Sequence, residues 1–334
     1  MLSGFCFLFH AIMTTFDDIQ DKVSAPSLEK KISSDRVLDV GFWGLTLLLA
    51  ISAGAVLIWV ILQTANSSIP AIQQFGLEFL TTKTWNPVTN IYGVLPQIYG
   101  TLVTSFIALL IAIPVGVGVA VFLTEDFVPR YITTPIAFAI ELIVAIPSVV
   151  LGLWGIFVLI PFLRPFFQFL NNNFGWIPIF SGGAPRGNNL FVVGLVLSLM
   201  IVPLIISITR STFEVLPPSL RAGSLALGAT RWETILKVLI PAGLSGIISS
   251  VMLAMGRAMG ETMVAAMMVG NANRIDVSIL QPGSTITALI ASQFGEAGRL
   301  QVSALMYAGL VLMVLSLIVN ILAELIIRRF QNIE

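Results

Sequence analysis

The chain has 334 residues, of which 57% are hydrophobic and only 10% are charged, and its mean hydropathy is +0.97. A soluble globular domain carries about 25% charged residues, so this composition predicts a membrane protein. Basic and acidic residues balance at 17 each, which excludes the basic excess that attracts nucleic acid. The single cysteine, Cys6, and the single histidine, His10, exclude disulfide frameworks and Cys/His metal clusters.

The first 39 residues precede the first apolar stretch of spanning length. Residues 1–16 are apolar but too short to span, and they carry neither a basic n-region nor an A-x-A cleavage site. Residues 17–39 mix both signs of charge with serine and Pro26. We interpret residues 1–39 as a cytoplasmic, partly disordered N-terminal segment, with Met13 as an alternative start, and residues 40–330 as one membrane domain.

Transmembrane helices are expected wherever about 20 mostly apolar residues follow one another, because the hydrocarbon core is about 30 Å thick. The spans must be helical, since unpaired backbone groups are costly in lipid. Six stretches have this length: residues 40–62, 98–123, 135–160, 190–209, 242–270 and 302–327. The predicted fold class is therefore an all-α membrane protein with six transmembrane helices.

Positive residues indicate the orientation, because short cytoplasmic loops carry an excess of Lys and Arg. If the N-terminus is cytoplasmic, most Lys and Arg residues fall on the inner side, and an even number of spans returns the C-terminus to that side. We therefore expect both termini in the cytoplasm. The long outer loops, residues 63–97 and 161–189, are interpreted either as interfacial belts of aromatic residues or as surfaces for a soluble partner outside the membrane.

The longest inner connection, residues 211–240, has the pattern of two short helices. Pro217-Pro218 can open a helix, since the first turn needs no proline N–H, and Gly228 is typical of a left-handed stop. A second helical run follows and ends at Pro241. Taken alone, this pattern fits either two amphipathic helices on the membrane surface or a structured docking loop.

Three charged residues fall inside the third and fifth expected spans. Arg257 and Glu261 lie in the middle of the fifth span, where a charge costs about 2.5–3.5 kcal/mol on insertion scales and usually faces a cavity or a partner. Their i, i+4 spacing predicts that they share one helix face and can pair, beside a small-residue stripe, Gly256 and Gly260, that favours close helix contact. Glu141 lies in the third span. These charges either neutralise each other as a structural pair or line a polar path.

The loop also resembles a known family. Residues 220–241, LRAGSLALGATRWETILKVLIP, resemble the signature loop of permeases of bacterial ABC-type importers. The pattern of that loop is E-A-A, three residues, Gly, nine residues, Ile, one residue and Leu-Pro. Gly228 and Pro241 match, whereas Ala222 stands at the glutamate position and Ile240 at the leucine position. In that family the loop docks into a groove of the cytoplasmic ATPase, so the missing glutamate removes one expected charge contact. The resemblance assigns a coupling loop at 211–241 with these residues: Arg221, Ala222, Gly223, Ser224, Gly228, Arg231, Glu233 and Pro241.

Three further blocks resemble the PstC-type permeases of bacterial phosphate importers. They are GRAMGETMVAAMMVGN at 256–271, ELIVAIPSVVLG at 141–152 and YGVLPQIYGTLVTSFIALLIAIPVG at 92–116. The resemblance implies the type I ABC importer permease fold and a complex with a PstA-type sister permease, two PstB-type ATPase copies and an extracytoplasmic phosphate-binding protein. It also implies that ATP and Mg²⁺ are used by the ATPase and that this chain binds no cofactor and is not itself an enzyme.

This resemblance turns the intramembrane charges into candidate residues of a translocation path for inorganic phosphate. Phosphate carries one to two negative charges at neutral pH, and the guanidinium fork suits its oxygens, so Arg257 is predicted on the path. Glu261 is assigned gating or counter-ion duty. Glu141 is a second path residue or the other partner of Arg257.

Several alternatives stay open. Within the family, the chain could be a PstA-type subunit or a permease for sulfate or molybdate. A stand-alone secondary transporter is disfavoured by the asymmetric loop and by the lack of obvious inverted repeats. An intramembrane serine protease would use the G-L-S-G string at 243–246, but it also needs a histidine on another span. The only histidine in the sequence is His10, near its start. No G-x-x-x-x-G-K-[ST] motif occurs, so ATP hydrolysis must come from a partner.

Overall fold

The computed structural model describes residues 32–125, 127–181 and 187–331. These belong to two compact units, residues 1–62 and residues 63–334, which are described separately. Within the described residues, five helices are long and apolar enough to cross a membrane, and a sixth span arises if one bent helix pair counts as a single span. The fold class predicted from the sequence, a six-span helical membrane protein, is confirmed.

The first unit is described from the start of helix α2 (Ile32–Phe75), which continues into the second unit. Most of the expected N-terminal segment lies outside the described residues, and residues 32–39 belong to helix α2. The apolar span runs from Val40 to Phe75, longer than the 40–62 stretch expected. The helix continues through Pro70, although an interior proline removes one helical hydrogen bond.

The second unit is built around two helices, α4 (Leu95–Thr124) and α8 (Leu190–Val215), which pack along each other. Glycines permit the close approach: a Cβ at Gly116 would lie 2.7 Å from Ile205, and one at Gly194 would lie 2.6 Å from Ile107. Helix α12 (Leu244–Gly260) packs onto this pair, and Thr209 and Ser250 hydrogen-bond across the α8–α12 contact. The predicted second and fourth spans are confirmed.

The third span is displaced from its predicted position. Helix α5 (Arg130–Val144) ends before Pro147, because the residue before a proline is disfavoured in the helical conformation. The apolar span is instead Ser148–Phe174, formed by consecutive α- and π-helical segments. The prediction of one helix over 135–160 is wrong, and residues 161–174, expected in an outer loop, are helical. The segments are α6 (Ser148–Trp154), η1 (Gly155–Leu159) and α7 (Ile160–Phe174), and a 3₁₀ turn, η2 (Pro178–Phe180), follows.

The fifth span is broken after Gly260, so the expected continuous helix over 242–270 is also wrong. Helices α10 (Arg231–Thr234), η3 (Ile235–Leu239) and α11 (Ile240–Ala242) are followed by α12 after a bend of 68°. Helix α12 then stops at Gly260, and the short helix α13 (Met263–Met268) follows. The sixth span is confirmed by α15 (Arg299–Gln331), and α14 (Ile286–Gln293) with the turn η4 (Phe294–Glu296) precedes it.

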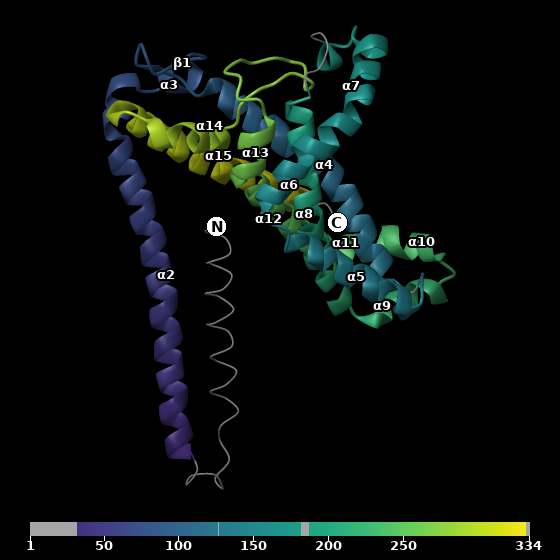
Figure 1. The fold of residues 1–334 in the computed structure, drawn as a ribbon. Helices are drawn as coiled ribbons and strands as arrows, with labels where there is room; N and C mark the ends of the chain where they lie inside the picture. Colours follow the sequence, from purple (N-terminus) through teal and green to yellow (C-terminus); the bar gives the residue numbers. More distant parts are fainter. Residues whose placement is uncertain (1–31, 126, 182–186, 332–334) are drawn as a thin grey trace. The chain divides into compact units, whose positions relative to one another are not determined.

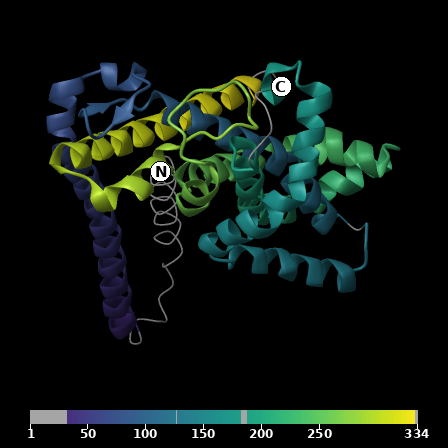
Figure 2. The same cartoon turned by 45° about the horizontal axis from the view of Figure 1, so that its top comes forward.

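A small aromatic hairpin occupies part of the predicted first outer loop. It consists of α3 (Glu78–Thr81) and two antiparallel strands, β1 (Trp85–Asn86) and β2 (Ile91–Tyr92). Phe79 stacks on Tyr307 of α15 with ring centroids 4.4 Å apart, so the hairpin lies beside α15 (Figures 1 and 2). The segment is therefore a packed element of the second unit. Whether it receives a soluble partner stays a prediction.

Candidate functional site

The break between α12 and α13 brings polar groups into an apolar stretch. Glu261 has an extended backbone (φ −69°, ψ 124°) and ends α12. Its carboxylate Oε1 accepts hydrogen bonds from the backbone N–H groups of Met263 (3.2 Å) and Val264 (3.5 Å). Glu261 therefore caps the start of α13, where free N–H groups and the helix dipole favour a negative charge.

Two threonine hydroxyls satisfy backbone carbonyls at the break. The hydroxyl of Thr287, in the first turns of α14, donates to the carbonyl of Glu261 at 2.8 Å, and the Thr262 hydroxyl donates to the Gly260 carbonyl at 3.2 Å. Backbone polar groups inside a membrane protein need such partners. Sequence reasoning missed Thr262 and Thr287, although glycine followed by two polar residues within an apolar run is a signal for a break.

Arg257 lies in the last turn of α12 with an exposed side chain. Among the described residues, it has no ion-pair or hydrogen-bond partner. The expected pairing with Glu261 is wrong, because the helix ends between the two residues and the carboxylate turns toward α13. What the structure leaves at the break is a free guanidinium on the surface of this chain.

The stripe of Gly256 and Gly260 is open in this structure. A Cβ added at either position would meet no atom within 4 Å among the described residues. The predicted close helix contact is therefore absent within this part of the chain. The surface beside Arg257 stays accessible to another chain.

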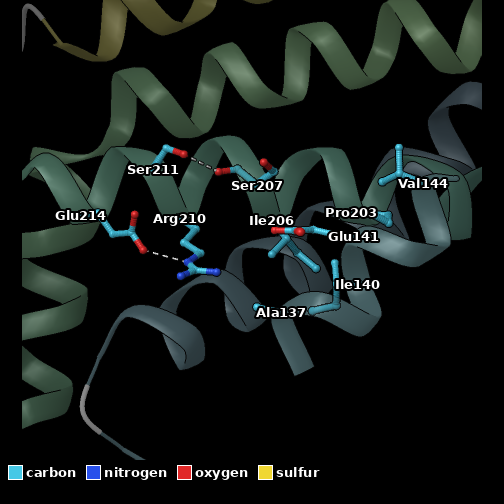
Figure 3. A pocket seen from close by; sticks show the side chains of 10 residues that line it. All are labelled: Ala137, Ile140, Glu141, Val144, Pro203, Ile206, Ser207, Arg210, Ser211 and Glu214. Carbon is cyan, nitrogen blue, oxygen red and sulfur yellow. Dashed lines mark hydrogen bonds and ion pairs between the residues drawn. The ribbon is translucent and has the colours of Figure 1, made fainter. Parts of the chain in front are cut away.

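Glu141 lies elsewhere than expected. It sits on α5, before the displaced third span, and lines a cavity of about 470 Å³ between α5 and α8. Figure 3 shows it across this cavity from Arg210, which pairs with Glu214 at 2.8 Å. Neither Arg257 nor Glu261 lines the cavity. The structure therefore does not bring the three candidate path residues together.

The inner connection forms the predicted helix, glycine turn and helix. Helix α9 (Pro218–Ala226) opens at Pro218, and Gly228 adopts φ +86°, as expected for a left-handed stop. Thr230 and Glu233 then form a reciprocal capping box at the start of α10. Hydrogen bonds from Thr230 and then Lys237 lower the pKa of the Glu233 carboxyl to about 2, so this residue is charged at neutral pH.

Two of the predicted coupling residues point inward. The guanidinium of Arg221 pairs with Glu125 at the end of α4 at 2.9 Å and donates to the carbonyl of Phe213 in α8 at 3.1 Å. The hydroxyl of Ser224 lies 2.9 Å from that of Thr234 in α10. Both residues hold the loop in shape, and Ser224 also lines a groove on the loop's outer face.

The outer surface of the loop is largely apolar. Leu227 and Trp232 keep 91% and 62% of their surface exposed, and Ala222 and Gly223 are exposed on α9. A shallow groove of about 340 Å³, lined by Leu220 and Leu227 among others, runs over this face. Of the other predicted coupling residues, Arg231 is exposed and Pro241 lies in α11 next to the 68° bend.

Residues 112–332 match the family described as binding-protein-dependent transport system inner membrane component. The chain belongs to this family. It is thus a multi-pass protein of the inner membrane, and the predicted type I ABC importer permease fold is confirmed. A solved structure described as a bacterial ABC transporter involved in the import of the acidic polysaccharide alginate has the same fold, with a TM-score of 0.59 over 91% of this chain and 99% of that chain at 16% identity.

Two relatives show that the similarity extends over most of the chain. The phosphate transport system permease protein PstC of Haemophilus influenzae is 42% identical over 291 residues, 86% of this chain and 92% of the relative. The probable phosphate transport system permease protein PstC of Methanocaldococcus jannaschii is 35% identical over 273 residues, 80% of this chain and 86% of the relative. The resemblance to PstC-type permeases is confirmed, and these relatives are named as permease proteins.

Proposed function

We propose that this chain is the permease subunit of an ATP-driven importer of inorganic phosphate and forms the translocation path together with a homologous sister permease. One observation carries the proposal: the chain is 42% identical to a protein named as a phosphate transport system permease, over 92% of that protein. In this proposal the chain catalyses no reaction itself.

The broken helix supports a path for an anion. Discontinuous transmembrane helices are typical of substrate sites in transporters, because irregular backbone inside a membrane is tolerated where it lines a cavity or protein. Arg257 lies one turn before the break with an exposed, unpaired guanidinium among the described residues. Its planar fork suits phosphate oxygens. We assign Arg257 to the path, at a site that binds weakly enough to release its ion.

The two carboxylates receive different roles. Glu261 holds the start of α13 through Met263 and Val264, so we assign it gating duty through the shape of the break. Glu141 faces the cavity beside Arg210 and is kept as a second path residue, separate from Arg257. Neither carboxylate neutralises Arg257 in this conformation.

The loop at 211–241 is proposed to couple this chain to the ATPase. Its exposed apolar residues, Leu227 and Trp232, suit a groove on a soluble partner. ATP and Mg²⁺ would then bind to a PstB-type ATPase dimer, and phosphate would arrive from an extracytoplasmic binding protein. We also propose that both termini, with residues 1–39, lie in the cytoplasm and that residues 40–330 form the membrane domain.

Reconstitution tests this function. The chain would be placed in proteoliposomes with its sister permease and ATPase, with binding protein outside and ATP inside, and uptake of radiolabelled phosphate measured. We expect uptake that needs ATP and does not respond to excess sulfate or molybdate. Uptake of one of those oxyanions instead would contradict the phosphate assignment, and uptake by this chain alone would contradict the importer.

A further inference from the structure

Helix α9 is held to the rest of the second unit mainly by polar contacts. None of its residues is buried, and its flanks are an extended segment at Leu216 and Pro217 and the left-handed turn at Gly228. A helix without buried apolar surface gains little stability from packing. Helix α9 can therefore rotate about these flanking segments unless side-chain contacts hold it in place. The side-chain contacts that hold α9 therefore determine whether a displacement of this helix also moves the membrane spans.

Arg221 provides the strongest of these contacts. Its Nε and Nη2 atoms lie 3.0 and 2.9 Å from the same carboxylate oxygen of Glu125, and Nη2 also donates to the Phe213 carbonyl. The Arg221 and Glu125 side chains keep only 26% and 17% of their surface exposed. Charge-assisted hydrogen bonds that are shielded from water are stronger than surface ion pairs. One side chain thus ties α9 to both central helices.

The ends of these helices form one packed junction. Val121 of α4, Phe213 of α8, Ile235 and Leu239 of η3, and Ile247 of α12 make a buried apolar cluster. Glu125 lies one turn beyond Val121 and caps α4, with its own N–H bonded to the Val121 carbonyl. A displacement of α9 is therefore passed through Arg221 to the junction where α4, α8 and α12 meet.

We propose that Glu125 and Arg221 are a positioning pair that makes α9 move together with α4 and α8, so that ATP hydrolysis on the partner drives the spans. The inference rests on the proposed function for the existence of an ATPase partner. It assigns Arg221 to transmission within this chain and adds Glu125, a residue of the α4 end. Without the pair, the ATPase still docks, but α9 moves about its flanking turns independently of α4 and α8. ATP hydrolysis is then uncoupled from transport.

The experiment compares Glu125→Ala, Arg221→Ala and the charge-reversed double variant Glu125→Arg/Arg221→Glu in the reconstituted complex. Three quantities are measured: ATPase recovered with the permease, ATP hydrolysed per phosphate imported, and hydrogen exchange of the amides in residues 218–226. Each single variant should retain the ATPase, raise the ATP consumed per phosphate by about five- to tenfold, and exchange faster in α9. The double variant should recover part of both effects.

Arg299→Gln is the matched control. It removes one exposed basic residue at the start of α15, outside the loop, so it should change neither the ATP per phosphate nor the exchange of α9. An unchanged ratio in Glu125→Ala would overturn the inference. If the single variants fail to assemble, recovery in the double variant supports it and continued failure overturns it.

The two proposals fail separately. If the unmodified complex imports another oxyanion, the phosphate assignment falls, and the ratio is measured with that oxyanion. If it imports neither phosphate nor another oxyanion, hydrogen exchange in α9 tests whether Glu125 holds the helix. Equal protection of the α9 amides in Glu125→Ala and in the unmodified chain would overturn the inference.

Discussion

Arg221 and Arg257 show how differently two arginines of one chain are used. Arg221 is on the loop predicted to face the ATPase, yet it reaches inward to Glu125 and Phe213. Arg257 was expected to pair with Glu261, yet it is exposed and without a partner among the described residues. Spacing along the sequence assumes a continuous helix, and the break at Gly260 removes that assumption. Arg221 has hydrogen-bond acceptors within the chain and Arg257 has none among the described residues, and this difference separates their roles.

Ala222 allows a test of the missing glutamate. The position is exposed on α9, so a longer side chain meets no steric cost there, and glutamate is a good helix former. We expect Ala222→Glu to fold normally and to strengthen ATPase binding by up to about 1 kcal/mol, the upper range of an exposed ion pair. Titration of the permease complex with ATPase measures this. Ala222→Gln is the control, and equal affinity for the two variants would show that the charge adds nothing.

Among the elements, helices α4 and α8 pack closely at glycine positions. Gly116 faces Ile205 so closely that an added Cβ would lie 2.7 Å from its side chain. Gly118, two residues further along the same helix, would meet no atom within 4 Å. The two glycines are indistinguishable in sequence, and only the packing separates them.

This contrast gives a stability prediction. Gly116→Ala should destabilise the folded chain by about 1–3 kcal/mol, because the extra methyl overpacks the contact. Gly118→Ala should be neutral or stabilising by about 0.5–1 kcal/mol, since alanine restricts the unfolded chain and favours helix. Thermal unfolding of the purified complex compares the two variants. Equal melting temperatures would contradict the close approach of α4 and α8.

Element boundaries are the part of the fold that sequence predicted least well. The second, fourth and sixth spans are uninterrupted apolar runs, and their positions are confirmed. The third shifted because Pro147 ends one helix and starts another within a single apolar stretch. The fifth broke at Glu261 because a carboxylate can cap a new helix and Thr287, from a distant segment, satisfies the exposed carbonyl. Hydropathy averaged over a window of residues does not detect either effect.

In the whole molecule, sequence predicted the family and the loop better than the contacts at the candidate site. The helix, glycine and helix pattern at 218–241 is confirmed, with Gly228 at φ +86°, since turn chemistry is local. One of the two predicted roles of Glu141 was to pair with Arg257, but Arg257 does not line the cavity that Glu141 lines; such a pairing depends on tertiary packing. The sequence did not indicate a role for Glu125, because its partner Arg221 lies 96 residues away along the chain.

Docking of the ATPase is predicted to depend on the apolar face of the loop. Leu227 is 91% exposed in this chain, and burying a leucine side chain contributes about 1.5–3 kcal/mol. Leu227→Asp should therefore weaken ATPase binding by about tenfold or more. Leu77→Asp, at another exposed leucine outside the loop (78%), should leave ATPase binding unchanged. Equal binding by both variants in a pull-down titration would place the interface elsewhere.

The most direct measurement of the central claim is phosphate uptake by a complex carrying Arg257→Ala. Its control is Arg299→Ala, which removes another exposed arginine at the start of α15. If Arg257 contacts the anion at the helix break, we expect uptake to fall by about tenfold or more, with Arg257→Lys retaining part of it, since a charge-assisted contact contributes about 1.5–3 kcal/mol. ATPase assembly and uptake by Arg299→Ala should be unchanged. Full uptake by a correctly assembled Arg257→Ala complex would contradict the account.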